Sequence, residues 1–206
     1  MKKFVLLLLL LVAPFALFSQ SKEQKEELKN IEGAWDLDNN GNIVYSRVIE
    51  DIEGSKEDIY NKVLNFFAYN YNSSLDVIQV KDKEAGIVTG KGYFKDFSYS
   101  TIMLMVSMNF SAYHVLRVDI KDGRARAILS VDRYELVSSG GDGPDNRSSI
   151  PIKDCFPVNK NGNKGQKKIY AKAFIDLNNR CLSTLDLLEK SLKEGNTSPE
   201  IEKSDW

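Results

Sequence analysis

The only histidine of the sequence, His114, is the first candidate for acid–base catalysis, because an imidazole exchanges protons near neutral pH. It alternates with Leu116, Val118 and Ile120 on the apolar side of a predicted strand, where a hydrogen-bonded core histidine is the more common outcome. The sequence contains no Gly-x-Ser-x-Gly motif, no His-Glu-x-x-His motif and no phosphate-binding loop. We therefore predict no catalytic residue, and an enzyme whose carboxylates only the fold would bring together stays open.

Two polar segments contain residue types that bind ions. Residues 142–146 offer oxygen ligands for calcium, but they lack the spaced acids and closing glutamate of a calcium loop, which favours a plain turn. Residues 162–165 precede Lys167 and Lys168 and could hold an anion, although a solvated linker before an ordinary helix is the simpler interpretation. Two cysteines and one histidine are too few for a zinc site. We predict neither a metal site nor a cofactor.

Aromatic and methionine side chains gather near the middle of the chain and could form an apolar binding lip. The aromatic residues come just before an apolar run, residues 102–106, and methionines follow within and after that run. Such side chains adapt to varied apolar ligands, although they would also suit a core crossover beneath a sheet. With the outward-facing side chains of neighbouring strands, the residues that we predict to contact a ligand are Tyr93, Phe97, Tyr99, Met103, Tyr113, Arg126 and Tyr134.

The sequence has two cysteines, Cys155 in a proline-flanked loop and Cys181 on a predicted helix. An exported protein can keep a disulfide, and these two residues could form one. They could equally remain separate thiols, with Cys181 packed as a small core residue. The sequence leaves both alternatives open.

Residues 1–19 have the layout of a secretory signal peptide, because Lys2 and Lys3 precede an apolar run that ends at Ser19 and Gln20. We predict cleavage after Ser19 and export to the periplasm or out of the cell. Lys and Arg total 28 and Asp and Glu total 29, so losing the two lysines changes the net charge from −1 to −3. We predict no nucleic-acid partner from this charge and no membrane span after cleavage, since no later apolar run is long enough.

Hydrophobic periodicity predicts the elements that would position these side chains. Residues 43–52 form a predicted strand, and Ser55 can cap a helix whose apolar residues recur at helical spacing. Residues 75–80 and 87–94 form a predicted hairpin. The second of its strands carries two glycines on one face, so another element could approach its backbone closely.

The dipeptide Asp122-Gly123 predicts a second hairpin with a two-residue turn. That turn fixes the register and places Asp119 opposite Arg126 on a mixed face. The other face of this hairpin is nearly all apolar and needs a cover, because a sheet with one dry face exposed to water is poorly stable.

The remaining segments complete one domain, residues 43–194. Residues 137–165 are rich in Gly, Ser, Asn and Pro and read as a long polar loop. Residues 167–193 carry an apolar stripe along a long helix. Residues 20–42 read as a flexible lead-in and residues 195–206 as a flexible tail.

This order of elements predicts a two-layer α+β fold. An antiparallel sheet of about five strands would carry two helices on one face, in the order β-α-β-β-β-β-α. We expect the C-terminal helix to grip the apolar face of the sheet, in a helix-grip-like arrangement.

Three segments carry a resemblance to a known family. They are the first predicted strand with residues 54–60 (Gly-Ser-Lys-Glu-Asp-Ile-Tyr), residues 86–92 (Gly-Ile-Val-Thr-Gly-Lys-Gly) and residues 118–126 (Val-Asp-Ile-Lys-Asp-Gly-Arg-Ala-Arg). Over about residues 43–135 the chain resembles the domain-of-unknown-function family 4468 of secreted proteins from Bacteroidetes-type bacteria. The resemblance implies a TATA-binding-protein-like fold. It supplies no catalytic residues, and the name of the fold does not imply DNA binding.

Three functions follow as hypotheses, in this order. The first is an exported noncatalytic binding module that holds a small apolar ligand or an envelope protein between the sheet and the C-terminal helix. The second is a structural or interaction protein that uses an exposed sheet face or edge. The third is an enzyme with an unrecognised carboxylate site. A deep cavity would favour the first, a filled core with an exposed apolar patch the second, and converging carboxylates the third.

Overall fold

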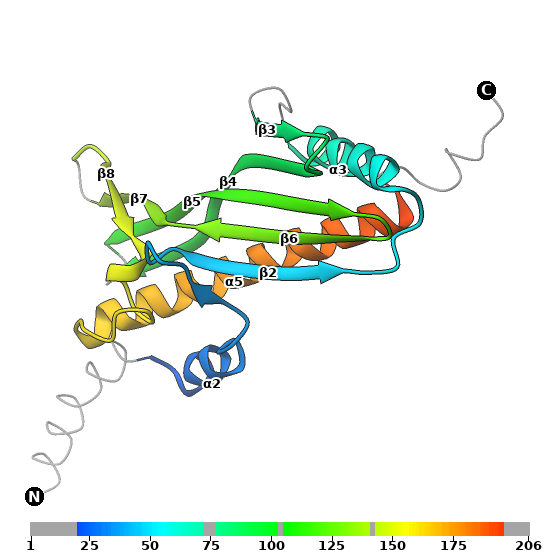
Figure 1. Cartoon of the computed structure of the whole chain (residues 1–206). Coiled ribbons are helices and arrows are strands. Elements are labelled where there is room, and N and C mark those ends of the chain that lie inside the picture. Colours follow the sequence, from blue (N-terminus) through cyan, green and yellow to red (C-terminus); the bar gives the residue numbers. More distant parts are fainter. Residues whose placement is uncertain (1–19, 72–76, 103–104, 141–142, 196–206) are drawn as a thin grey trace, which may run out of the picture.

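The computed structural model of the chain describes residues 20–71, 77–102, 105–140 and 143–195. Its strands form a single sheet, with the long helix α5 running behind it (Figure 1). The elements, in chain order, are α2 (Lys22–Asn30), β1 (Asp36–Leu37), β2 (Ile43–Ile49), α3 (Lys56–Asn70), β3 (Ile78–Asp82), β4 (Ile87–Ile102), β5 (Val106–Lys121), β6 (Arg124–Val131), β7 (Arg133–Gly140), β8 (Asn146–Pro151), the 3-10 helix η1 (Ile152–Asp154) and α5 (Lys164–Glu194).

The sheet has the order β1-β2-β6-β5-β4-β3, and β7 pairs with the first part of β5 and with β8. Every pairing is antiparallel. The predicted α+β class is therefore confirmed. The described part of the sheet has eight strands, more than the expected five or so, because the short β1 and the β7–β8 hairpin add to the predicted set.

The central β5–β6 hairpin has the predicted turn and register. Gly123 has a φ of 71°, which a glycine adopts without strain. Asp119 lies opposite Arg126, as expected.

The strands β4 and β5 are each 16 residues long, and a bulge divides β4. The register with β5 shifts between Phe94 and Ser98, and Asp96 has a φ of 44°. The Ser111 hydroxyl oxygen accepts a 2.9 Å hydrogen bond from the Asp96 backbone N–H. Beyond the bulge β5 leaves β6 and pairs with β7 instead, so the bulge marks the point at which the sheet changes partners.

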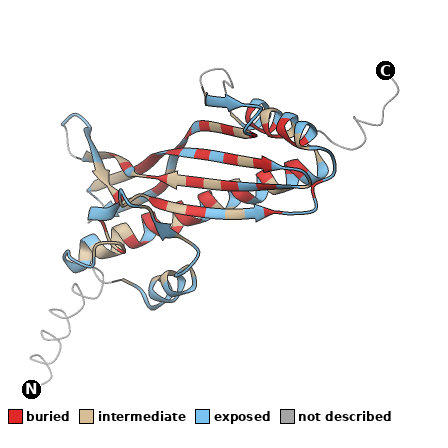
Figure 2. Cartoon of the chain, in the orientation of Figure 1, coloured by how far each residue is buried: buried red, intermediate tan, exposed pale blue. Residues whose placement is uncertain are grey.

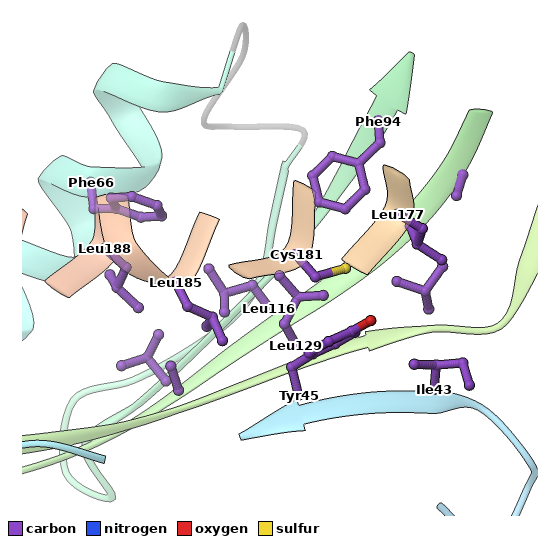
Figure 3. Close-up of a cluster of buried hydrophobic side chains, with 14 of the residues drawn as sticks. Ile43, Tyr45, Phe66, Phe94, Leu116, Leu129, Leu177, Cys181, Leu185 and Leu188 are labelled. Carbon is purple, nitrogen blue, oxygen red and sulfur yellow. The ribbon is translucent and has the colours of Figure 1, made fainter. Parts of the chain in front are cut away.

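The predicted C-terminal helix is present as α5 and covers the apolar face of the sheet. Asn163 caps it through a capping box with Gln166, so the helix begins slightly earlier than the apolar stripe predicts. Side chains of α5 meet those of β2, β5 and β6 in one buried cluster (Figure 3). The labelled members of that cluster include Tyr45, Leu116, Leu129, Leu177, Cys181, Leu185 and Leu188.

Helix α3 lies on the same face, over β4 and β5, and begins at the predicted cap Ser55. A Cβ atom on Gly90 would stand 2.4 Å from the Phe67 ring, and one on Gly92 would stand 2.4 Å from the Tyr71 ring. The two glycines therefore let α3 approach the strand. Burial alternates along the central strands (Figure 2), because one side faces α3 and α5 and the other side is uncovered.

The expected flexible lead-in, residues 20–42, is wrong, because it contains α2. Ser21 caps this helix through a capping box with Gln24, and the Gln24 amide donates a 3.3 Å hydrogen bond to the Lys168 carbonyl in α5. Trp35 then packs edge-on against Phe174, with ring centroids 5.1 Å apart. The segment is polar because α2 lies on the outside of α5, not because it lacks structure.

The long polar loop expected at residues 137–165 is also wrong. The segment contains the second half of β7 and all of β8, which pair antiparallel, with Glu135 opposite Ser149. The first four residues of β8 are all exposed, so the strand lacks the apolar alternation by which strands are recognised. After it, Ile152 and Cys155 are buried in the core.

The two cysteines are unpaired and buried, so the disulfide that the sequence allowed is not formed. Burial raises the pKa of the Cys155 thiol to about 11. It also raises the pKa of the Cys181 thiol. Both side chains therefore stay protonated near neutral pH and act as small core residues.

No helix within the described ranges is both long and apolar enough to cross a bilayer. The predicted signal peptide, residues 1–19, lies outside the described residues. The predicted tail also lies outside them, apart from Gly195.

Candidate functional site

The space between the central strands and α5 is filled by side chains. Leu116 and Leu129 on the sheet and Leu177 and Leu188 on the helix are all fully buried (Figure 3). This part of the fold is a packed core and leaves no room for the gripped ligand that the first hypothesis placed there.

His114 is a core residue, as its position on the apolar face predicted. Its ring stacks on Phe94 with centroids 3.9 Å apart, and its Nε2 lies 3.0 Å from the Tyr71 hydroxyl. Burial lowers the pKa of His114 to about 4, so the ring is neutral near pH 7. Its buried Nδ1 has no hydrogen-bond partner in the described part of the chain.

The side of the sheet turned away from α3 and α5, here called the open face, carries exposed apolar side chains. On β4 and β5, Tyr93 and Tyr113 pack against each other with ring centroids 4.7 Å apart, and each is nearly half exposed. Val48 on β2 is 56% exposed. The large exposed hydrophobic residues of the open face are Val48, Val80, Tyr93, Tyr113 and Val115.

Cations lie between these apolar side chains. The Asp119 carboxylate accepts hydrogen bonds from Arg126 Nη2 at 2.6 Å and from Arg117 Nε at 2.7 Å. Partial burial favours a higher pKa for Asp119, but these two arginines outweigh it and lower the pKa below its usual value. Arg124 and Lys121, at the end of the hairpin, form no ion pair with any described residue. The central part of the open face is therefore strongly positive.

A hollow of about 420 Å³, here called the hairpin hollow, lies at this end of the open face. Val48 and Ile87 contribute apolar walls, and Arg117, Arg124 and Arg126 contribute charge. Asp119 lines the hollow as well, already bound by two arginines. The hollow can therefore accept an apolar side chain next to a negative group.

A second hollow of about 690 Å³, here called the β4 cleft, lies where β4 faces the end of α3 and the middle of α5. It opens beside β4 after the paired stretch with β3, which ends at Gly90. Its described lining is largely aromatic and basic and contains no Asp or Glu. That lining is Phe66, Asn70, Tyr71, Val77, Lys91, Gly92, Tyr93, Phe94, Lys95, Tyr113, His114, Arg180, Thr184 and Leu187.

The predicted ligand-binding residues do not form one site. Tyr93, Tyr113 and Arg126 lie on the open face, whereas Tyr99 is exposed farther along β4, beyond the bulge. Phe97 is partly buried against the core, and Met103 lies outside the described residues.

Tyr134 was wrongly predicted to face outward with Arg126. It is fully buried and packs edge-on against Phe110, with ring centroids 5.4 Å apart. The reason is a shift of one residue in the register along β5. Leu116 pairs with Leu129 in β6, whereas Phe110 pairs with Leu136 in β7, so Tyr134 turns from the open face to the core face.

The β4 cleft was missed because three of its lining residues come from α5. Arg180, Thr184 and Leu187 lie off the apolar stripe that identified this helix. The only local signal was Gly92, which indicated that another element approaches the β4 backbone closely but did not identify that element.

Neither hollow brings two carboxylates together. Among the described residues, the group that comes nearest to a catalytic cluster consists of Ser98, Lys172 and Asp176. The Ser98 Oγ donates a 2.5 Å hydrogen bond to the Asp176 carboxylate, and Lys172 Nζ lies 2.6 Å from the same carboxylate. Ser98 is buried, and this network joins β4 to α5. We interpret it as a structural contact between the strand and the helix.

Comparison with known proteins places this fold in a family. Residues 45–135 match the model of a domain of unknown function, DUF4468, with TBP-like fold. No match was found among curated proteins.

Two solved structures are similar. One is a DUF4468 family protein from Bacteroides ovatus, with 14% identity and a TM-score of 0.47, covering 79% of this chain and 94% of that one. The other is a TBP-like protein from Parabacteroides distasonis, with 16% identity and a TM-score of 0.48, covering 75% of this chain and 96% of that one. The match to the family model assigns residues 45–135 of this chain to the DUF4468 family, a domain of unknown function with TBP-like fold.

Proposed function

We propose that this protein is an exported, noncatalytic binding domain whose open face docks a protein partner that presents acidic and apolar side chains. The observation that carries the proposal is the composition of the open face, where exposed valines and tyrosines lie among exposed arginines and lysines. Export rests on the signal-peptide layout of residues 1–19.

The apolar part of the open face supports a docking role. Contiguous exposed apolar surface is uncommon on a soluble monomer and marks interaction sites. Tyr93 and Tyr113 are large side chains of the kind that is enriched in protein interfaces. Val115 on β5 and Val48 on β2 are exposed on the same face of the sheet. Because α5 covers the other face, a partner can contact these strands only from the open face.

The charge of the open face supports an acidic partner. The mature chain would have a net charge of −3, yet the open face concentrates positive charge. Asp119, the carboxylate of β5 on this face, is already bound by two arginines. The exposed cations of the open face are Lys91 on β4, Arg117 and Lys121 on β5, and Arg124 and Arg126 on β6. Such a surface attracts an acidic partner and repels a second copy of itself.

A labelled peptide of repeated Glu-Glu-Val-Val provides a direct test. In an extended chain alternate side chains point to opposite sides, so this repeat presents both glutamate and valine on either side. Fluorescence anisotropy should detect binding that weakens at high salt, because exposed charges are screened beyond about 10 Å at 0.1 M salt. A Lys-Lys-Val-Val peptide should not bind.

The matched variants are Arg124→Glu and Arg147→Glu. Both arginines are exposed on strands and neither forms an ion pair with another described residue, so neither change should disturb the fold. Arg124→Glu should abolish binding, and Arg147→Glu, on β8, should leave it unchanged. Equal effects of the two variants would contradict the proposal. Tighter binding of oligothymidylate than of the acidic peptide would also contradict it, and would point to a nucleic-acid partner.

A further inference from the structure

We propose that the β4 cleft binds a small amphipathic carboxylate, with an aromatic or alkyl body against the aromatic wall and the carboxylate facing Arg180. The cleft shares Lys91, Tyr93 and Tyr113 with the open face that is proposed to dock a protein partner, but its anchor Arg180 lies on α5, on the other side of the sheet. It uses residues of α3, α5 and β4 that the hairpin hollow does not share, so either proposal can fail without the other.

The walls of the cleft suit an apolar body. The open walls include Tyr71, which caps the end of α3, Tyr93 from β4 and Leu187 from α5, with the buried rings of Phe66 and Phe94 behind them. Phe66 and Tyr71 pack edge-on, with centroids 6.1 Å apart, so they form one continuous aromatic surface. The volume of about 690 Å³ lies within the range of about 300–1,000 Å³ that is usual for small-molecule sites.

The charge of the cleft favours an anion. Arg180 and Lys95 line it, and neither forms an ion pair with any residue in the described ranges. With no Asp or Glu in the described lining, these cations have no negative partner within the cleft. A guanidinium can bind a carboxylate through two parallel hydrogen bonds, which makes Arg180 the natural anchor.

A buried polar atom beside the cleft also indicates a ligand. His114 lines the cleft and is only 3% exposed. The Tyr71 hydroxyl occupies its Nε2, whereas its buried Nδ1 has no partner among the described residues. A buried polar atom without a partner costs free energy, and a polar ligand at the inner end of the cleft could supply one.

These observations together select the ligand class. A purely apolar ligand would leave Arg180 without a negative partner, and a small inorganic anion would leave the exposed Tyr93 and Leu187 side chains in water. A carboxylate joined to an aromatic or alkyl body matches both parts of the lining.

Three probes separate the parts of this inference. 4-Phenylbutyrate carries both the body and the charge, 4-phenylbutyramide carries the body alone, and acetate carries the charge alone. In a two-dimensional ¹⁵N–¹H NMR titration, 4-phenylbutyrate should shift the amides of Gly92, Arg180 and Thr184. The amide should bind about tenfold more weakly, which corresponds to one charge-assisted hydrogen bond, and acetate should not bind measurably.

Arg180→Gln should reduce the affinity for 4-phenylbutyrate to that for the amide, while Arg147→Gln should leave it unchanged. The His114 ring nitrogens provide a second readout, because the Nδ1 signal should move when the acid binds. Equal affinity for the acid and the amide would contradict the anionic class. Absence of shifts around the cleft, or shifts confined to the open face near Val48, would overturn the site itself. Arg124→Glu should have no effect here, which separates this result from that for the protein partner.

Discussion

Replacing Gly90 by alanine tests the close packing of α3 on the sheet. The new Cβ would stand 2.4 Å from Phe67 Cε1 and 3.0 Å from two further ring carbons, closer than real Cβ atoms come. Phe67 is fully buried and its ring lies against Phe66 and Tyr71, so it cannot turn away freely. The ring or the helix must shift, and overpacking of this kind costs about 1–3 kcal/mol.

A glycine-to-alanine change also restricts the unfolded chain, which stabilises a protein by about 0.4–1 kcal/mol where the alanine fits. The net effect of Gly90→Ala should therefore be a loss of about 1–2 kcal/mol in the free energy of unfolding. Urea denaturation at an unchanged slope measures it.

Two controls isolate the contact between Gly90 and Phe67. A Cβ on Gly143 would meet nothing within 4 Å, so Gly143→Ala should be neutral or slightly stabilising. In a Phe67→Leu background the Gly90→Ala change should cost less, since the ring that it meets is gone, and the difference is the coupling energy of the pair. A neutral or stabilising effect of Gly90→Ala in the wild type would refute the placement of α3 against β4.

Three further predictions rest on the structure and a fourth rests on the sequence of residues 1–19. Burial lowers the folded-state pKa of His114 to about 4, whereas the unfolded chain has a value of about 6.5. As the pH falls, the unfolded chain therefore binds the proton first, and the free energy of unfolding should fall by up to about 3 kcal/mol between pH 6.5 and 4. His114→Asn should flatten this pH dependence between pH 5 and 6.5. Leu185→Ala, in the buried face of α5, should cost about 2–5 kcal/mol in denaturant unfolding, and a loss below 1 kcal/mol would mean that α5 does not cover the sheet. A double-mutant cycle on Asp119 and Arg126, a pair in which the arginine is 55% exposed, should give a coupling below about 1 kcal/mol, whereas several kcal/mol would indicate a covered open face. Mass spectrometry of exported protein should find the N-terminus at Gln20, and an intact Met1 on protein confined to the cytoplasm would disprove export.

Local signals in the sequence predicted the centre of the fold. Asp122-Gly123 can adopt a two-residue turn, which leaves a single register for the hairpin around it, and that register is the one observed. The apolar stripe of α5 predicted a long helix because neither a strand nor a loop produces a 3.6-residue period over so many turns. Ser55 marked the start of α3 because its side chain satisfies a free backbone N–H there.

The periphery could not be predicted because its structure depends on contacts between distant residues. The bulge at Asp96 depends on Ser111 in the next strand. Tyr134 is buried because β7 pairs with β5 beyond that bulge, and no local period shows where a strand changes partners. The exposed strand β8 lacks an apolar face, so nothing distinguished it from a loop.

The candidate sites were predictable only in part, for the same reason. The hairpin register placed Arg126 on the outer face, and alternation placed Tyr93 and Tyr113 there too. Arg180 joins the β4 cleft only because α5 crosses this part of the sheet. A charged residue outside the apolar stripe of a helix looks in the sequence like any solvent-exposed residue, so its position does not predict a cleft.

The role of the open face as a docking surface is tested most directly by mapping the acidic peptide onto the protein by NMR. Residues of β2, β5 and β6, including Val48, Arg117 and Ile128, should shift in proportion to the bound fraction, and the amides of α5 should stay in place. Shifts confined to α5 or to the β4 cleft, with those three residues unmoved, would contradict the account.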